Sequence, residues 1–138
     1  AVPAFPGDPS RKLPPNVYRP EDTQNFTALL AEFRRQLDEL GAKTGKHYLL
    51  TIATPPDEGR YSKFELGKMH LYLDYINLMT YDIHGAWAEH GPTNFQAPLY
   101  LSPDDPSPAD EKVSVDTAVT GYLKLGVPPK KIVIGIPF

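Results

Sequence analysis

Cysteine is absent from this sequence of 138 residues, which excludes disulfide bonds and thiolate chemistry in the chain and leaves its redox compartment open. No apolar run approaches the roughly 20 residues that a membrane helix needs, so we expect no membrane partner. An excess of basic charge is also missing, because 14 Lys and Arg residues are scattered among 17 Asp and Glu residues. Without a basic patch, we expect no nucleic-acid partner.

Proline, in contrast, is abundant. The chain has 16 prolines, well above the usual frequency of about 5%. They gather within 3–20, 55–56, 92–108 and 128–137, and such clusters are typical of loops between ordered elements. Residues 1–20 in particular show little hydrophobic periodicity, and we expect an extended loop there.

Hydrophobic periodicity predicts three amphipathic helices. The first has Pro20 before it, acidic residues in its first turn and Gly41 as its stop. The second opens with Ser62 and Glu65 at the spacing of a capping box. The predicted helices are 21–41, 62–74 and 114–126, and the residues of the second that should face inward are Phe64, Met69 and Leu73.

Three short runs rich in β-branched, aromatic and long apolar residues predict strands, over 47–54, 75–82 and 131–138. By the period of two, the middle strand has one mixed face and one mainly apolar face. These faces carry Asn77, Met79 and Tyr81, and Ile76, Leu78 and Thr80, respectively. The loop 83–113 that follows is far longer than the usual 2 to 6 residues, so we expect it to be functional or mobile.

Helices and strands therefore alternate, which indicates a parallel α/β fold. No Gly-rich phosphate turn follows either early strand, so a closed barrel is favoured over a doubly wound open sheet. An eight-stranded barrel takes about 250 residues and three strands cannot close one. We expect part of a TIM (β/α)8 barrel with parallel strands, in which Met79 and Tyr81 line the floor of a site at the carboxyl end of their strand.

Residues 75–87 carry Met79, Tyr81, Asp82 and, a short loop later, Trp87. This pattern resembles the strand-six signature of glycoside hydrolase family 18, the chitinases, in which Met-x-Tyr-Asp is followed by a loop tryptophan. Other segments resemble the family in the same order, so that the resemblance covers about strands five to seven. They are 19–30 for its fourth helix, 49–53 for its fifth strand, 94–100 for its sixth loop and 131–138 for its seventh strand.

The resemblance implies hydrolysis of β-1,4 linkages between N-acetylglucosamine units with retention, using the acetamido carbonyl of the substrate as nucleophile. It implies that Tyr81 donates its hydroxyl to the acetamido oxygen and that Asp82 accepts hydrogen bonds from the sugar. Met79 would pack beneath the sugar ring, and Trp87 would stack on the sugar of the leaving-group side. Each residue also has a structural alternative: a buried tyrosine, a loop-capping aspartate, core packing and a loop anchor.

The family's catalytic pattern, Asp-x-x-Asp-x-Asp-x-Glu, does not occur in this sequence. We expect it upstream of Ala1, so that the chain alone is inactive. The resemblance implies a secreted protein whose partners are chitin or chito-oligosaccharides and the remainder of the same barrel. A non-catalytic chitin-binding lectin and a family member acting on N-glycans or peptidoglycan-like polymers stay open as alternatives.

Two further groups of polar residues lie in the long loop. The acidic pairs Asp104-Asp105 and Asp110-Glu111 lie among Pro and Ser with no strand to hold them, and we expect them to be solvated surface charge. His84 and His90 flank Trp87 but have no evident third ligand. We therefore expect no metal site and no cofactor.

Overall fold

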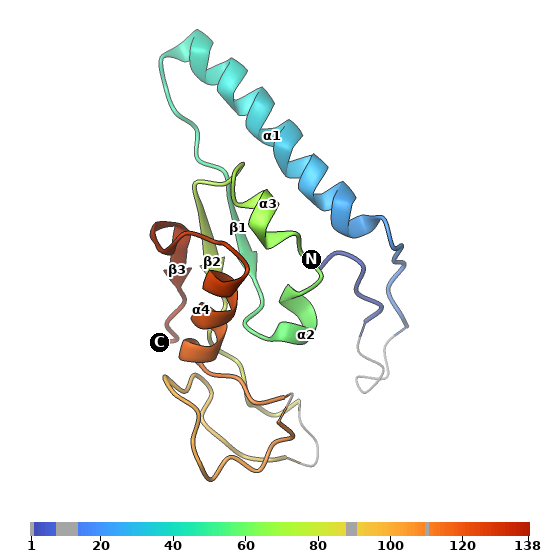
Figure 1. Cartoon of the computed structure of the whole chain (residues 1–138), viewed down its shortest axis with the longest axis vertical. Helices are drawn as coiled ribbons and strands as arrows, with labels where there is room; N and C mark the ends of the chain where they lie inside the picture. The colour runs from blue at the N-terminus through green and yellow to red at the C-terminus, as the bar shows by residue number, and fades with distance from the viewer. Residues whose placement is uncertain (1, 8–13, 88–90, 110) are drawn as a thin grey trace.

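The computed structural model describes residues 2–7, 14–87, 91–109 and 111–138 (Figure 1). Its centre is a parallel three-stranded sheet of order β1-β2-β3, in which Thr51 lies opposite Tyr75 and Ile76 lies opposite Ile132. This pairing confirms the predicted parallel α/β arrangement. The strands are β1 (Thr51–Thr54), β2 (Tyr75–Leu78) and β3 (Ile132–Ile134). The helices are α1 (Asp22–Thr44), α2 (Glu58–Tyr61), α3 (Leu66–Met69), α4 (Val115–Lys124) and the 3-10 helix η2 (Pro129–Lys131).

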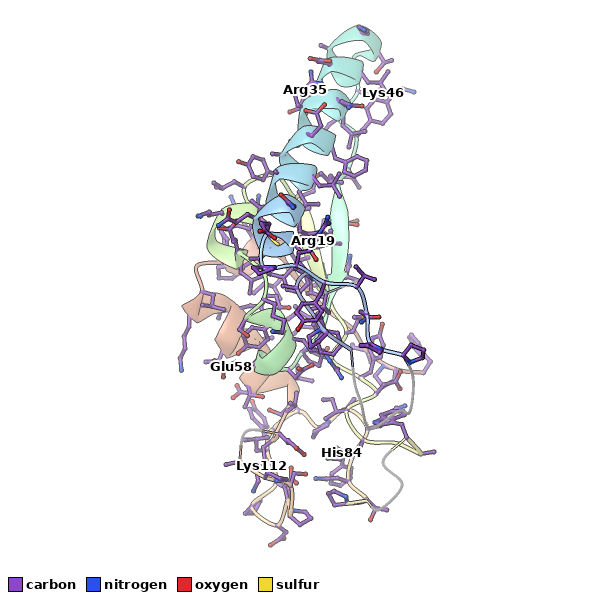
Figure 2. All side chains as sticks on the ribbon, turned by 90° about the vertical axis from the view of Figure 1, so that its right-hand side faces the viewer. Arg19, Arg35, Lys46, Glu58, His84 and Lys112 are labelled. Carbon is purple, nitrogen blue, oxygen red and sulfur yellow. The ribbon has the colours of Figure 1, made fainter. Side chains whose placement is uncertain are left out.

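Figure 1 places the carboxyl end of α1 and the long loop at opposite ends of the molecule, with the sheet between them. The carboxyl ends of the strands point toward the long loop. Figure 2 shows the same separation in a second view, since Arg35 and Lys46 lie at one end and His84 and Lys112 at the other. No helix within the described residues is long and apolar enough to cross a membrane.

The two faces of β2 have different surroundings. Ile76, Leu78 and Thr80 are buried, and the two apolar residues among them pack in one core with the side chains of α3 and α4. Met79 and Tyr81, which follow the opposite alternation, remain partly exposed. The predicted alternation is therefore confirmed. The partly exposed face corresponds to the interior of a closed barrel.

Helix α1 runs past its predicted stop. It ends at Thr44, and Gly45 adopts a left-handed φ of 69° while its N–H donates to the Gly41 carbonyl. The prediction that the helix stops at Gly41 is therefore wrong. Helix-favouring Ala42 and Lys43 continue the helix, and the glycine that takes the left-handed conformation ends it.

The single helix predicted over 62–74 is wrong. The chain forms two one-turn helices, α2 and α3, and Ser62 lies at the carboxyl end of α2 instead of opening a helix. Asp57 starts α2 early, because its side chain accepts the Arg60 N–H at 3.1 Å. Between the helices, Phe64 turns into the core and meets the ring of Phe26 edge-on, with centroids 5.5 Å apart.

The strands are shorter than predicted, since regular pairing covers only 51–54, 75–78 and 132–134. Residue 131 belongs to η2 instead of the last strand. Helix α4 is also shorter than the predicted 114–126, but it has a capping box. Ser114 accepts the Thr117 N–H at 3.2 Å, and the Thr117 hydroxyl accepts the Ser114 N–H at 2.8 Å.

Asp74 joins several elements at the amino end of the sheet. One of its carboxylate oxygens accepts the Leu50 N–H at 2.7 Å and contacts Arg34 of α1 at 3.3 Å. The other contacts the His47 imidazole. Burial raises the pKa of Asp74, but the hydrogen bonds from Leu50 and His47 and the nearby cations outweigh it and hold the pKa below its ordinary value.

Replacing Asp74 with Asn should lower the free energy of unfolding at neutral pH by roughly 1.5–3 kcal/mol, the range for hydrogen bonds to a charged group. Because the folded-state pKa lies below the unfolded value, this stabilisation is present above about pH 4 and is lost as the pH falls through the folded pKa. Denaturant unfolding between pH 7 and pH 3, in a polypeptide that contains the whole barrel, measures both effects.

Asp38→Asn is the matched control for Asp74→Asn. Asp38 contacts the same Arg34 at 2.7 Å, but its side chain is 60% exposed, so its loss should cost much less. Equal losses of stability in the two variants would contradict a special role for Asp74.

Candidate active site

A groove of about 900 Å³ lies at the carboxyl end of the sheet. Met79, Tyr81, Asp82 and Trp87 all line it. The rest of its wall comes from the segment after β1, including α2, and from the long loop after β2. The structure therefore brings the four predicted site residues together, as expected for residues at one strand mouth. Their chemical roles stay predictions.

Tyr81 is positioned by the chain that follows β3. The Gly135 N–H donates to the Leu78 carbonyl at 2.9 Å, and the Thr80 hydroxyl donates to the Gly135 carbonyl at 2.8 Å. A Cβ atom at Gly135 would lie 2.5 Å from Cε1 of Tyr81 and 2.6 Å from the Leu78 carbonyl oxygen. Only a glycine allows this close approach of the phenol ring. The Tyr81 hydroxyl makes no hydrogen bond with the other described residues.

Asp82 is exposed and has a left-handed φ of 54°, a conformation that Asp tolerates better than most residues. Its Oδ1 accepts a hydrogen bond from the Gln96 side-chain amide at 2.8 Å. The carboxylate thus faces solvent on the groove and is held by one side chain of the long loop.

Trp87 is 51% exposed, and its ring lies against Gly85. A Cβ atom at Gly85 would lie 2.3 Å from Cζ3 of the indole, so a larger residue there would displace the ring from this position. Met79 is held at the floor by its backbone, whose N–H donates to the Thr54 carbonyl at 2.9 Å. An exposed indole in the same groove as an apolar side chain is an arrangement that can bind a sugar ring.

Sequence reasoning missed the second wall of the groove, which the segment after β1, including α2, supplies. Asp57 and Arg60 line it, and the Arg60 guanidinium contacts the Asp57 carboxylate at 3.2 Å. These residues directly follow the carboxyl end of a predicted strand. In a barrel, that position alone would have made them candidates for the site.

The expectation that all acids of the long loop are solvated is wrong for Asp105. Asp105 is only 7% exposed, and its carboxylate accepts the Ser107 N–H at 2.9 Å. Hydrogen bonds from the backbone and the hydroxyl of Ser107 hold the pKa of Asp105 below its ordinary value. The reason is local, since Asp-Pro-Ser allows an Asx-type turn that encloses the carboxylate. Asp104 and Glu111 are exposed.

His84 contributes to the loop structure. Its Nδ1 lies 3.2 Å from the Phe95 carbonyl oxygen and its Nε2 lies 3.5 Å from the Ser107 hydroxyl. Within the ranges that the structure describes, no three His, Asp or Glu residues come together in a way that could hold a metal ion. His90 and Asp110, which also entered the sequence analysis, lie outside the described residues.

Comparison with known proteins places residues 5–138 in the family described as Glycosyl hydrolases family 18. Chitinase A1 of Niallia circulans is 42% identical over 126 residues, which are 89% of this chain and 18% of that protein. The structure of chitinase ChiA74 from Bacillus thuringiensis is 46% identical and matches with a TM-score of 0.82 over 89% of this chain and 19% of that one.

A third match is the Ostrinia furnacalis Group IV chitinase, whose structure was solved in complex with allosamidin. It is 32% identical, with a TM-score of 0.79 over 99% of this chain and 33% of that one. The chain spans between 18% and 28% of the length of six curated relatives. Together with the parallel sheet, these likenesses confirm the predicted fold class, part of a (β/α)8 barrel.

Replacing Gly135 with Ala should destabilise the barrel by roughly 1–3 kcal/mol, the usual cost of overpacking, because the new methyl group would meet both the Tyr81 ring and the Leu78 carbonyl. Denaturant unfolding measures the loss. Gly59→Ala is the control, since the nearest atom to a Cβ there is 3.7 Å away and Ala favours its helix. Equal stability of Gly135→Ala and the parent protein would contradict the close seating of Tyr81.

Proposed function

The chain belongs to glycosyl hydrolase family 18, and we propose that it forms the sugar-holding part of the active site of a chitinase. The reaction is hydrolysis of β-1,4 linkages between N-acetylglucosamine units of chitin or chito-oligosaccharides. One observation carries the proposal. Met79, Tyr81, Asp82 and Trp87 line a single groove at the carboxyl end of the sheet, where barrel enzymes place their active sites.

Substrate-assisted retaining hydrolysis explains why a phenol belongs in this groove. The acetamido carbonyl of the substrate attacks its own sugar, and the developing charge on that group needs a placed partner. Tyr81 donates its hydroxyl to the acetamido oxygen and orients it. Because its ring is held against Gly135, the hydroxyl is positioned before the substrate arrives, which is the condition for efficient transition-state stabilisation.

Asp82 and Met79 hold the same sugar from two sides. The exposed Asp82 carboxylate accepts hydrogen bonds from sugar hydroxyl or amide groups, which are donors of matching chemistry. Met79 supplies an apolar, adaptable contact beneath the ring. Trp87 stacks on the apolar face of the sugar on the leaving-group side and buries indole surface that is now exposed.

The proton for the leaving oxygen must come from outside this sequence, which does not contain the family's acidic pattern. The acids of the groove are poor substitutes. Asp57 is paired with Arg60, and Glu111 lies on an exposed loop with no neighbouring strand. The residues of this chain therefore bind and polarise the substrate, and a carboxylic acid in the rest of the barrel breaks the bond. The membership of family 18 supports the further proposal that the enzyme is secreted.

Tyr81→Phe in the complete barrel should lower kcat for chito-oligosaccharides by about 10²-fold or more, the usual cost of removing a donor that meets developing charge. KM should change little, because the hydroxyl acts mainly in the transition state. Steady-state kinetics give both values.

The matched control for Tyr81→Phe is Tyr75→Phe, which removes a hydroxyl at the opposite end of β2 and should leave the rate unchanged. A loss confined to KM in Tyr81→Phe would reduce Tyr81 to a residue that only positions the sugar.

The 138-residue polypeptide by itself should show no turnover of chito-oligosaccharides, because the general acid is not in it. Product analysis after long incubation tests this. Turnover by the pure polypeptide would overturn the assignment of roles. A complete barrel that binds these oligosaccharides without cleaving them would favour the chitin-binding lectin. Selective cleavage of N-glycans would favour a family member that acts on N-glycans or peptidoglycan-like polymers.

A further inference from the structure

We propose that Gln96 is a positioning residue of the active site, which sets the direction of the Asp82 carboxylate and does not touch the substrate. The inference rests on the proposed function, because it assigns a role to a residue that acts through Asp82. Gln96 is not among the residues that line the groove, so any role it has must act through a neighbour.

Two consecutive residues of the long loop dock on three consecutive residues after β2. The Gln96 side-chain amide donates to Asp82 Oδ1 at 2.8 Å, and the Gln96 carbonyl accepts the Ile83 N–H at 2.9 Å. One residue earlier, the Phe95 carbonyl oxygen lies 3.2 Å from Nδ1 of His84. Gln96 therefore contacts both the side chain of Asp82 and the backbone directly after it.

Asp82 needs such support. It lies past the paired residues of β2, so no strand neighbour fixes its backbone, and its φ of 54° is in the left-handed region. Asp tolerates this conformation better than most residues, but it still costs more than an ordinary helical or extended backbone, and surrounding contacts stabilise it. The Ile83–Gln96 backbone bond holds the turn, and the amide of Gln96 fixes which way the carboxylate points.

The segment that contains Phe95 and Gln96 is itself anchored to helix α4. The Pro98 carbonyl accepts the Val115 N–H at 2.9 Å, and the Leu99 carbonyl accepts the Asp116 N–H at 3.1 Å. Helix α4, which these residues open, is fixed on the core by the fully buried Tyr122. We call residues 95–99 the strut, because they connect the first turn of α4 to Asp82.

Packing alone does not hold the strut, since Phe95, Gln96 and Leu99 are all exposed. Its position depends on the hydrogen bonds at its two ends. A change at the Gln96 side chain should therefore alter the Asp82 carboxylate and leave the backbone bonds of the strut in place. This separation makes the role of Gln96 testable.

Gln96→Glu in the complete barrel is the critical variant. It keeps the size of the side chain and the backbone carbonyl, but it puts a second carboxylate against Asp82. We expect kcat/KM for chito-oligosaccharides to fall about 10-fold or more, since small misplacements of a catalytic constellation have large effects on rate. Gln96→Asn, which keeps an amide, should recover part of the loss.

Gln36→Glu is the matched control. The Gln36 amide donates to the Glu32 carboxylate at 2.8 Å on the exposed surface of α1, so the substitution makes the same chemical change away from the groove. Its activity should equal that of the parent protein. In an Asp82→Ala background, Gln96→Glu should change kcat/KM by less than about twofold, because residues that act as a unit are not additive.

Parent-like activity of Gln96→Glu would overturn the inference, and so would an undiminished effect in the Asp82→Ala background. If the parent barrel does not cleave chito-oligosaccharides, the proposed function fails instead. The inference is then decided by a crystal structure of Gln96→Glu. A redirected Asp82 carboxylate supports it, and an unchanged one overturns it.

Discussion

The parallel pairing of β2 between β1 and β3 is the constraint on which the rest of the structure depends. In this register, one side of β2 buries Ile76 and Leu78 in the core and the other side presents Met79 and Tyr81 to the groove. A slip of one residue would exchange the two sides, because side chains alternate along a strand. It would expose the apolar pair and bury the phenol. The same hydrogen bonds that stabilise the sheet therefore decide which residues can meet a substrate.

Beyond the end of β2, the site is built from close approaches and hydrogen bonds more than from packing. Gly135 lets the Tyr81 ring lie against the backbone, and Gly85 does the same for Trp87. Asp82 is held by the strut, which contacts α4 at its other end. Loops of this length cost conformational entropy to order, and several backbone contacts along this one offset that cost. A rigid sheet and helix thereby fix groups that lie on an otherwise exposed loop.

Two of the places where sequence reasoning failed, the segment 62–74 and Asp105, have one cause in common. In the segment 62–74, the apolar pattern correctly placed Phe64, Met69 and Leu73 in the core. The segment does not form the single continuous helix that this pattern predicted. Asp57 starts a turn early, and burial of Phe64 separates it from the next turn. In the long loop, Asp105 is enclosed by its own turn. Hydrogen bonds from short polar side chains to the nearby backbone can override helical periodicity and the usual exposure of acidic residues. The pattern of hydrophobic residues carries no information about these hydrogen bonds.

The sequence by itself determined the alternation of helical segments and strands, the two faces of β2 and the grouping of Met79, Tyr81, Asp82 and Trp87 at one strand mouth. These properties depend on the spacing of neighbouring residues, which can be read directly along the chain. Only the tertiary structure decided that the segment after β1, including α2, forms the second wall, that Gly135 seats Tyr81 and that Gln96 holds Asp82. Those contacts join residues far apart in the sequence. They depend on the path of the backbone and on how each polar group satisfies its hydrogen bonds, and no local pattern encodes either.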